Sequence, residues 1–514
     1  MKYIKTLKIG NKKGFSLVFS YMVVAVLVIL AASLYARSIS EIVIGEKQKM
    51  STQAFAIAEA GLDRAYYLLR KDFEDDPTAP SWADGDIYNI TCSTNTTSYY
   101  PLNCGSTSIG EGSYSIELKN VASTDKEIWI KTIGTVNDVS KGIEAYVAIA
   151  DFAIWNQVLS AGGGAAGGTT INGNVEIRGS VTILGNNLNP GDFAINLSGG
   201  ALIGNNYDGI PAELGSRIPL CPQVTFNGEL VDSLGAELRV KNGKVGLSGT
   251  GTAGQPDATP NGYKETLDGV YVSGDYGGNK RQANVYSDNG SGYRYDLGES
   301  ISFPKFNDPY PGYANYEAYL RDNAFIITDP AQLAELQDIK PNSIFVIEDT
   351  VNGKGKITMD GNGNMTIDGI VFIDDSVTGY TGDFIMSAAP SLDTINYTGK
   401  GSVVAKGNVN IGVNLYTPLG NNSFPENHIM GVMTPGDIVF DVSQLDVMGL
   451  FYAGATIDAS KQTDVAGGFA ADYFDMGSNV PRIFLVPEVA NNLPPGMIGS
   501  DTIWMIQLVS WKKL

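Results

Sequence analysis

The sequence predicts an α+β protein that is mainly β, with one long N-terminal helix, a small antiparallel sheet and then a parallel β-helix. Three observations lead to this fold class. Residues 15–71 contain no proline and only two glycines, Gly45 and Gly61. Residues 113–149 alternate between apolar and polar side chains, as strands do. From residue 169 onward, short motifs of glycine, asparagine and apolar residues recur in a chain that has 61 glycines among 514 residues.

Composition excludes several classes of function. The chain has 35 lysines and arginines against 55 acidic residues, a net charge of −20. Nucleic-acid binding needs a basic surface that displaces counterions, so we expect no nucleic-acid partner. The one histidine, His428, excludes a metal site built from several histidines.

The cysteines leave two interpretations open. Cys92 and Cys104 lie twelve residues apart, and a disulfide between them would suit an oxidising compartment. The alternative is that both thiols, like that of Cys221, are unpaired. The sequence has no CxxC motif, so zinc and thioredoxin-like chemistry lack support.

The N-terminus resembles a leader followed by a membrane span. Residues 1–14 contain five lysines and no acid, and residues 15–36 carry no charge. Twenty-two helical residues span about 33 Å, enough to cross the hydrocarbon core of a bilayer. The lysines should stay in the cytoplasm. We therefore expect a single-pass cytoplasmic (inner) membrane protein with its bulk outside the cytoplasm.

The apolar segment continues as helix beyond the membrane. An unbroken helix over 15–71 would be about 85 Å long. Its outer half places Ala54, Ala58, Gly61 and Ala65 on one seam, and small residues let helices approach closely. Two roles remain open for this seam: packing on the chain's own next domain, or packing against helices of neighbouring subunits in a filament.

Two motifs in this region carry a family resemblance. Lys12-Lys13-Gly14 followed by Phe15 resembles the processing site of type IV pilins and pseudopilins. The stretch 53–62 contains Ala-Glu-Ala-Gly and is similar to PilX-type minor pilins and to the type II secretion pseudopilin GspK. The resemblance covers residues 12–70, here fused to a large β-rich domain. It implies cleavage after Gly14 by a prepilin peptidase and N-methylation of Phe15.

One departure from the family pattern is informative. Most pilins have a glutamate five residues after the cleavage site, where this chain has Phe19. In the family that carboxylate is thought to pair with the terminal amine of a neighbouring subunit, so its absence favours a position at the filament tip. The alternative is that Phe19 simply faces lipid. Glu59 is a further candidate for filament packing, although a lone exposed glutamate is more often solvated.

The rest of the chain divides by composition. We expect a small antiparallel head over 72–159, a flexible glycine–alanine linker over 160–168, a β-helix-like domain over 169–498 and a C-terminal strand over 499–514. Similar motifs begin at Gly173, Gly363, Gly407 and Gly436, and the 44 residues between the second and third correspond to two turns of 22. An insertion over about 205–342, rich in tyrosine, is a candidate binding face. The alternative fold is an antiparallel sandwich of hairpins.

Candidate sites for chemistry are few. One segment has the oxygen-ligand spacing of a short calcium loop, although the same residue types are common in turns. Its candidate Ca²⁺ ligands are Asp360, Asn362, Asn364 and Asp368. Asp374 and Asp375 are adjacent, so on a strand they would point to opposite faces and not form a catalytic pair. We expect no enzyme and no other cofactor.

The sequence therefore predicts a structural minor pilin or pseudopilin, at or near a filament tip, that displays its β-domain on a pilus or the cell surface. Its partners would be other pilins, the prepilin peptidase, the inner membrane, and a tip adhesin or surface ligand. One alternative is a single-pass surface-anchored binding protein that never enters a filament. Another is a glycan-active β-helix enzyme.

Overall fold

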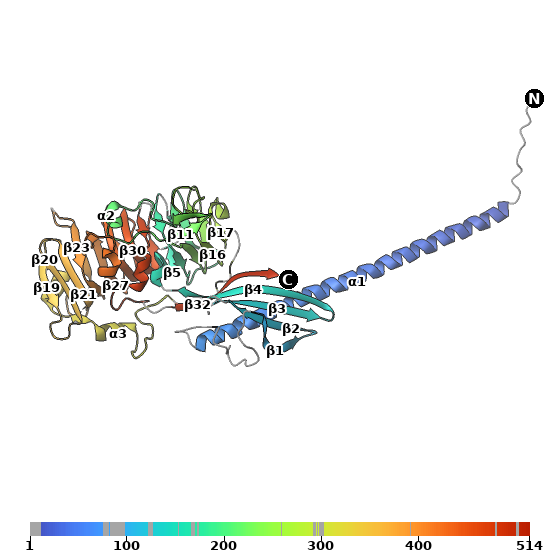
Figure 1. The fold of residues 1–514 in the computed structure, drawn as a ribbon, viewed down its shortest axis with the longest axis horizontal. Coiled ribbons are helices and arrows are strands. Elements are labelled where there is room, and N and C mark those ends of the chain that lie inside the picture. Colours follow the sequence, from blue (N-terminus) through green and yellow to red (C-terminus); the bar gives the residue numbers. More distant parts are fainter. Residues whose placement is uncertain are drawn as a thin grey trace, which may run out of the picture. The chain divides into compact units, whose positions relative to one another are not determined.

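The computed structural model describes residues 12–75, 82, 98–121, 127–152, 154–165, 170–171, 174–258, 260–290, 295, 297, 303–390, 392–477, 481–499 and 503–514. The chain forms two compact units. The first, the helix–sheet unit, comprises residues 1–148 and 509–514, and the second, the body, comprises residues 149–508. The protein is mainly β with a long N-terminal helix, as predicted (Figure 1).

The helix–sheet unit consists of one long helix and one antiparallel sheet of order β1-β2-β3-β4-β32. Helix α1 spans Lys12–Asp75. The strands are β1 (Tyr100–Ile109), β2 (Gly112–Asn120), β3 (Glu127–Val136), β4 (Val139–Phe152) and β32 (Ile503–Lys513). The body is thus inserted in the chain between β4 and β32.

Because buried and partly exposed side chains alternate along the strands, one face of this sheet packs against α1. Residues of β2 and β3 alternate between buried and partly exposed along each strand. The buried set contains alternating apolar side chains of β2, β3 and β4, namely Tyr114, Ile116, Leu118, Ile128, Ile130, Ile143, Ala145 and Val147. Because strand side chains alternate between faces, this pattern fixes the register of the sheet.

The first half of the body contains β5 (Leu159–Ala165), β6 (Thr170–Ile171), β7 (Glu176–Arg178), β8 (Val181–Ile183), β9 (Phe193–Leu197), β10 (Leu202–Gly204), α2 (Ala212–Gly215), β11 (Gln223–Phe226), β12 (Glu229–Asp232), β13 (Glu237–Val240), β14 (Lys244–Leu247), β15 (Thr252–Ala253), β16 (Gly269–Val272) and β17 (Tyr276–Gly277). The short helices are η1 (Ile154–Asn156) and η3 (Arg281–Asn284) in this half, and η4 (Ser423–Asn427) and η5 (Pro487–Asn491) in the second half.

The second half contains α3 (Tyr316–Asn323), β18 (Phe325–Ile327), α4 (Pro330–Leu336), β19 (Ile344–Glu348), β20 (Gly355–Asp360), β21 (Asn364–Ile373), β22 (Phe384–Ser387), β23 (Thr394–Thr398), β24 (Lys400–Ala405), β25 (Val409–Gly412), β26 (Asn414–Tyr416), β27 (Ile429–Thr434), β28 (Ile438–Phe440), β29 (Leu445–Asp458), β30 (Thr463–Asp475) and β31 (Arg482–Phe484).

One ladder of parallel strands runs through the body. Strand β18 pairs with β21, and β24, β27, β29 and β30 follow in turn. Strand β30 then pairs with β5, and the ladder continues through β8, β13 and β16. Every one of these pairings is parallel. A single short strand cannot bury its apolar face alone, so the stacking of strands creates the core.

The chain enters this ladder in the middle. Successive strands of the chain extend the ladder from β5 to β16. The chain then crosses to the opposite end of the ladder, where β18 lies. The strands after β18 extend the ladder back from that end until β30 pairs with β5. The two ends of the body's chain therefore lie on neighbouring strands, since β31 also pairs with β7. The indole Nε1 of Trp155 donates a hydrogen bond to the carbonyl oxygen of Ile498 at 2.7 Å. Residues 205–342, predicted as an insertion, contribute β13, β15, β16 and β18 to the same sheet.

The predicted flexible linker over 160–168 is corrected by the structure. Leu159–Ala165 forms the buried strand β5. Its glycines serve close packing rather than flexibility: a Cβ on Gly162 would lie 2.3 Å from Oδ1 of Asp472, and one on Gly163 would lie 2.4 Å from the ring of Tyr473. Only residues without side chains allow the neighbouring strand to approach this closely.

Two of the repeat motifs lie on directly paired strands, and a third does not. The motifs at Gly407 and Gly436 pair directly, with Val409 opposite Ile438 in parallel strands. The motif at Gly363 instead pairs with β23, so the 44-residue spacing to Gly407 does not measure two turns of 22. Successive partners in the main ladder lie 18 residues apart at Phe451 and Phe469, so the period is not constant.

Candidate functional site: the N-terminal helix

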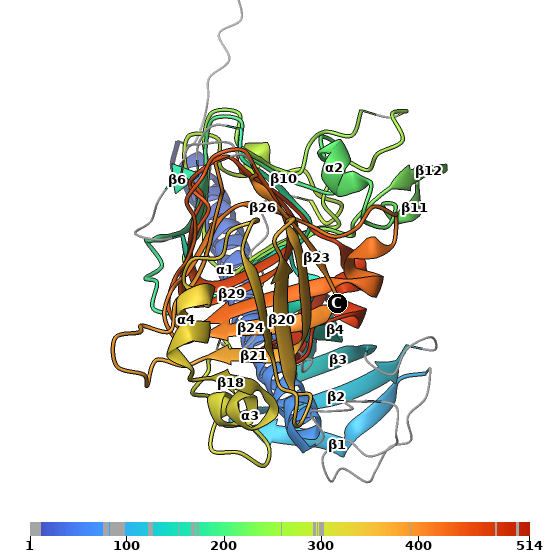
Figure 2. The same cartoon turned by 90° about the vertical axis from the view of Figure 1, so that its left-hand side faces the viewer.

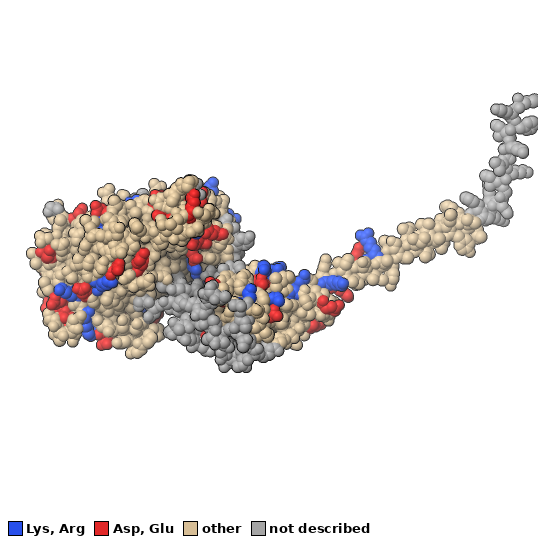
Figure 3. Space-filling model, in the orientation of Figure 1, with Lys and Arg blue, Asp and Glu red and all other residues tan. Residues whose placement is uncertain are grey.

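The first half of α1 has apolar side chains that are exposed. From Ser16 to Ala36 every side chain is exposed, and none carries a charge. By length and composition, this helix is a candidate membrane span near the N-terminus. Figure 3 shows the protruding part of α1 with few charged side chains. An uncovered apolar surface of this length is unstable in water, so it requires lipid or other apolar helices around it.

The second half of α1 packs on the chain's own sheet. Ala54, Ala58, Gly61 and Ala65 are all buried. The hydroxyl of Thr132 on β3 donates to the carbonyl oxygen of Ala58 at 2.9 Å. The prediction that this seam packs against neighbouring subunits is therefore corrected: the small residues admit β2 and β3 of the same chain, the alternative that the sequence left open.

Between these halves, α1 has an amphipathic stretch that no described part of the sheet buries. Its apolar side chains Ile39, Ile42, Val43 and Ile44 are exposed. An ion pair there joins Arg37 to Glu41, at 3.0 Å, on the solvent-exposed surface. The apolar surface of α1 thus extends beyond the uncharged span of residues 15–36.

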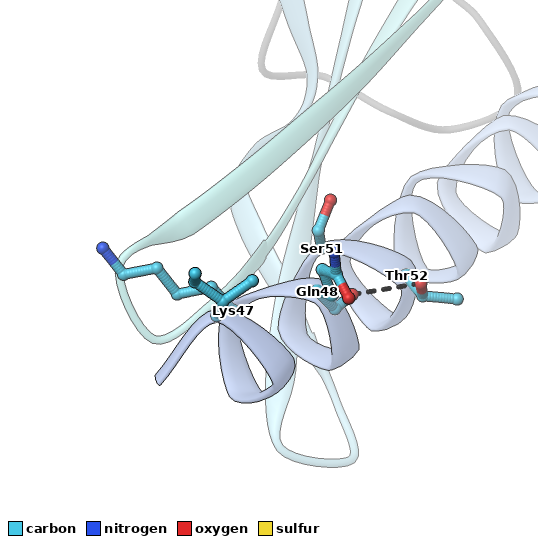
Figure 4. Close-up of a pocket in the computed structure, with 5 residues that line it drawn as sticks. Lys47, Gln48, Ser51 and Thr52 are labelled. Carbon is cyan, nitrogen blue, oxygen red and sulfur yellow. Dashed lines mark hydrogen bonds between the residues drawn. The ribbon is translucent and has the colours of Figure 1, made fainter. Parts of the chain in front are cut away.

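A shallow groove begins at the end of this stretch. It is lined by Ile44, Lys47, Gln48, Ser51 and Thr52 from successive turns of α1, and the Thr52 hydroxyl donates to the Gln48 carbonyl at 3.1 Å (Figure 4). An adjoining pocket shares Ser51 and Thr52 and adds Phe55 of α1, Lys141 of β4, Lys513 of β32 and the C-terminal Leu514.

The ammonium group of Lys513 lies 4.0 Å from the centre of the Phe55 ring, a cation–π contact. Sequence reasoning missed this part of the site. The C-terminal strand was predicted, but nothing in the sequence indicates that it lies beside α1.

The remaining predicted filament residues lie on α1 as follows. Gly14 and Phe15 are in its first turns, and the Phe15 side chain lies outside the described part. Phe19 is exposed within the bare apolar half. Glu59 is exposed on the packed half, on the side opposite the buried seam. Phe19 and Glu59 are therefore both accessible to other molecules.

The candidate calcium ligands lie on the hairpin β20–β21. Oδ1 of Asp360 accepts hydrogen bonds from the backbone N–H groups of Asn362 (2.7 Å) and Asn364 (3.1 Å). The Asn364 side-chain amide donates to the other Asp360 oxygen. These bonds, that of Asn364 first, lower the pKa of Asp360 to about 2. Asp368 lies further along β21, opposite Lys356. In the part of the chain that the structure describes, no three His, Cys, Asp or Glu side chains gather as a metal site would require.

Of the three cysteines, the structure describes the side chain of Cys221. Cys92 and the side chain of Cys104 lie outside the described residues, so their disulfide stays a prediction. Cys221 is a free thiol of intermediate exposure. Burial raises its pKa to about 12, so the reactive thiolate form is rare at neutral pH.

The predicted binding tyrosines form one cluster on and before α3. The rings of Tyr310 and Tyr319 lie 4.5 Å apart, and those of Tyr310 and Tyr316 lie 5.0 Å apart. The Tyr316 hydroxyl donates to the Gly496 carbonyl, and the Tyr313 hydroxyl to Asp322. The tyrosines therefore largely pack on one another and anchor α3 on the body.

Ion pairs also anchor α3. Arg321 donates to Glu317 at 3.0 Å and to Asp374 at 2.8 Å, and Lys406 donates to Glu317 at 3.0 Å. Asp374 is buried and engaged by Arg321, so it does not form a catalytic pair with Asp375. Burial would raise the pKa of Glu317, but the hydrogen bonds from Lys406 and Arg321 outweigh it and lower that pKa. The pKa of Asp374 is also lowered, since Arg321 and Ser376 outweigh the effect of burial.

We expect the anchoring of α3 to be lost in acid. A carboxyl whose pKa is lowered on folding stabilises the fold above its unfolded pKa, and this stabilisation disappears as pH falls through the folded value. Ordinary carboxyl pKa values are about 4, so the tyrosine near-ultraviolet circular dichroism should change below about pH 4. The double variant Glu317→Gln and Asp374→Asn should lack this transition. An identical acid transition in that variant would contradict the assignment.

Comparisons with known proteins give a likeness among solved structures and none among families or curated proteins. No protein-family model matches the chain, and neither does any curated protein. Among solved structures, the chain is similar to the competence-associated pilin ComZ from Thermus thermophilus, with 20% sequence identity and a TM-score of 0.48. The match covers 90% of this chain and 97% of ComZ.

Proposed function

We propose that this protein is a structural minor subunit of a type IV pilus or a type II secretion pseudopilus. The observation that carries the proposal is α1, which is one continuous helix with two different halves. Its first half is apolar and exposed, and its second half packs against the chain's own sheet. Such a helix is anchored in a membrane, and it also suits transfer into a bundle of similar helices.

The stretch between the halves supports a filament over a simple anchor. Ile39, Ile42, Val43 and Ile44 lie beyond the uncharged span and are still exposed. About one to two turns past a bilayer-spanning segment, a helix that only served as an anchor would gain from polar residues at these positions. In a filament, helices of other pilins cover these side chains.

Phe19 supports a position at the filament tip. A subunit without a carboxylate at this position cannot neutralise the terminal amine of a neighbour, and a buried unpaired amine is costly. Such a subunit is best placed first in the filament. The resemblance to PilX-type and GspK-type subunits supports the same position.

The body is then what the filament displays. We take its ladder of parallel strands to be a parallel β-helix, since partners succeed one another along the ladder in both halves of the chain. It would meet a tip adhesin or a surface ligand outside the cell, without catalysis, with Ca²⁺ as the one candidate ion and no nucleic-acid partner. The N-terminus would start in the cytoplasm, where the prepilin peptidase cuts.

The test is the N-terminus of the protein purified from its native membranes. We expect peptide mass spectrometry to find a chain that begins at N-methylated Phe15 and that is also present in sheared fibres. Gly14→Glu should block cleavage, leave residues 1–14 attached and remove the protein from the fibres. Gly45→Ala is the matched control, since a Cβ at Gly45 meets no atom within 4 Å.

Retention of residues 1–14 in the wild-type protein, together with its absence from sheared fibres, would contradict the proposal. That result would favour the surface-anchored binding protein.

A further inference from the structure

The β19–β20 hairpin at one end of the body has an unpartnered strand edge. Figure 2 views this end, with β20 in front. Strand β19 pairs antiparallel with β20, and among the described residues it pairs with no other strand. The edge strand of a sheet presents unpaired N–H and C=O groups, which natural proteins usually protect with charges, proline or a covering segment.

The side chains of β19 do not protect this edge. Phe345 and Ile347 point into the core and are buried. Ile344 and Val346 point outward and are 75% and 69% exposed. The strand contains no proline, and its only charged residue, Glu348, is at its end. The terminal strand of a stack usually has a polar outer face, so these two β-branched side chains are exceptional.

The opposite end of the ladder is covered by the chain itself. The backbone N–H of Tyr295 donates to the carbonyl of Val272 on β16 at 3.2 Å. Nearby, the N–H of Tyr286 donates to Ala253 on β15 at 2.8 Å. One end of the stack is thus closed by backbone hydrogen bonds, while at the other end no described strand pairs with the outer edge of β19.

The hydrogen-bonding pattern shows which backbone groups of β19 face away from β20. The N–H of Asp349 donates to the carbonyl of Gly355 on β20. In an antiparallel pair, residues alternate between bonding the partner and facing away from it. The backbone groups of Phe345 and Ile347 therefore bond β20, and those of Ile344, Val346 and Glu348 face the open edge. These three residues define what we call the β19 edge.

We propose that the β19 edge binds an extended strand of another protein by strand addition. The partner strand would place two apolar side chains beside Ile344 and Val346 and a basic one beside Glu348. Its own N–H and C=O groups would bond those of the β19 edge, as in other complexes in which a peptide extends a sheet. This role does not depend on membership in a filament.

A second copy of this chain is a poor occupant. Residues 149–508 contain 39 acidic and 18 basic residues, so two bodies repel each other. Antiparallel pairing of two copies centred on Val346 would also place Ile344 of one copy opposite Glu348 of the other. A neutral or basic strand from a different protein has neither disadvantage.

The test uses the full-length chain in detergent micelles and a labelled peptide, Ser-Lys-Thr-Val-Thr-Val-Ser, followed by fluorescence anisotropy. In antiparallel pairing its lysine lies opposite Glu348 and its valines opposite Val346 and Ile344. We expect saturable binding that protects the amides of residues 344–348 from hydrogen exchange. N-methylation of the two valine amides keeps the side chains but removes the donors, and should weaken binding by about tenfold or more.

Variants of the protein give the matched comparison. Val346→Pro removes an N–H that faces away from β20, so it should leave β19 in place and weaken binding by about tenfold. Val351→Thr changes a side chain that is 85% exposed in the next turn, outside the edge, and should leave binding unchanged.

Absence of binding, or equal binding of the methylated and unmethylated peptides by the wild-type protein, would overturn the proposal even if Val346→Pro failed to fold. A dimer of the full chain that Val346→Pro abolishes would also overturn it, in favour of a second copy.

Discussion

Gly134→Ala is expected to detach α1 from its sheet. A Cβ on Gly134 would lie 2.1 Å from the carbonyl oxygen of Ala54 and 2.5 Å from the backbone nitrogen of Ala58. Both atoms belong to the backbone of α1, so no side chain can rotate away, and the helix must move. Overpacking of this kind costs about 3 kcal/mol, which corresponds to about a hundredfold faster hydrogen exchange of residues 54–69.

Two other glycines of the helix–sheet unit provide a graded control. A Cβ on Gly61 would meet the ring of Tyr114 at 3.2 Å, and this side chain can shift, so Gly61→Ala should cost less. Gly45→Ala meets no atom and should stabilise the helix by about 1 kcal/mol. Unchanged exchange of residues 54–69 in Gly134→Ala would mean that β3 does not cover the seam of α1.

The sequence was most informative about α1 and its sheet. The absence of proline and the uncharged span predicted the helix, and alternation predicted the strands, because both signals are local. The seam of Ala54, Ala58, Gly61 and Ala65 was recognised, but its partner was left open. Small residues show that something approaches closely, and only the tertiary structure shows that Gly134 and Thr132 of the same chain do so.

The body was less predictable. Glycine and asparagine motifs indicated short stacked strands, but the order of stacking is a long-range property. Nothing local to Phe469 indicates that it pairs with Leu159, more than three hundred residues earlier. The glycines at 162 and 163 were misinterpreted for the same reason, because the strand and side chains that crowd them come from the end of the chain.

Trp155→Ala is expected to open the body where its first and last strands meet. Trp155 is buried, and its indole donates to the carbonyl of Ile498 at 2.7 Å. Truncation removes the packing of a large ring and leaves that carbonyl without its donor. Such a change costs about 3–5 kcal/mol. Because β30 pairs with β5 beside this residue, these two strands should lose protection from hydrogen exchange first.

Which strands lose protection from hydrogen exchange distinguishes local opening between β5 and β30 from unfolding of the whole body. Strands β21 and β24 belong to the second half of the ladder, and they should keep their protection under conditions in which β5 and β30 exchange. Trp155→Phe retains a ring and should cost less, while Trp511→Ala, at a side chain that is 52% exposed, should change stability by less than about 0.5 kcal/mol. Simultaneous loss of protection in all four strands would show that the two halves of the ladder unfold as one cooperative unit, because their joint is then no weaker than the rest of the stack.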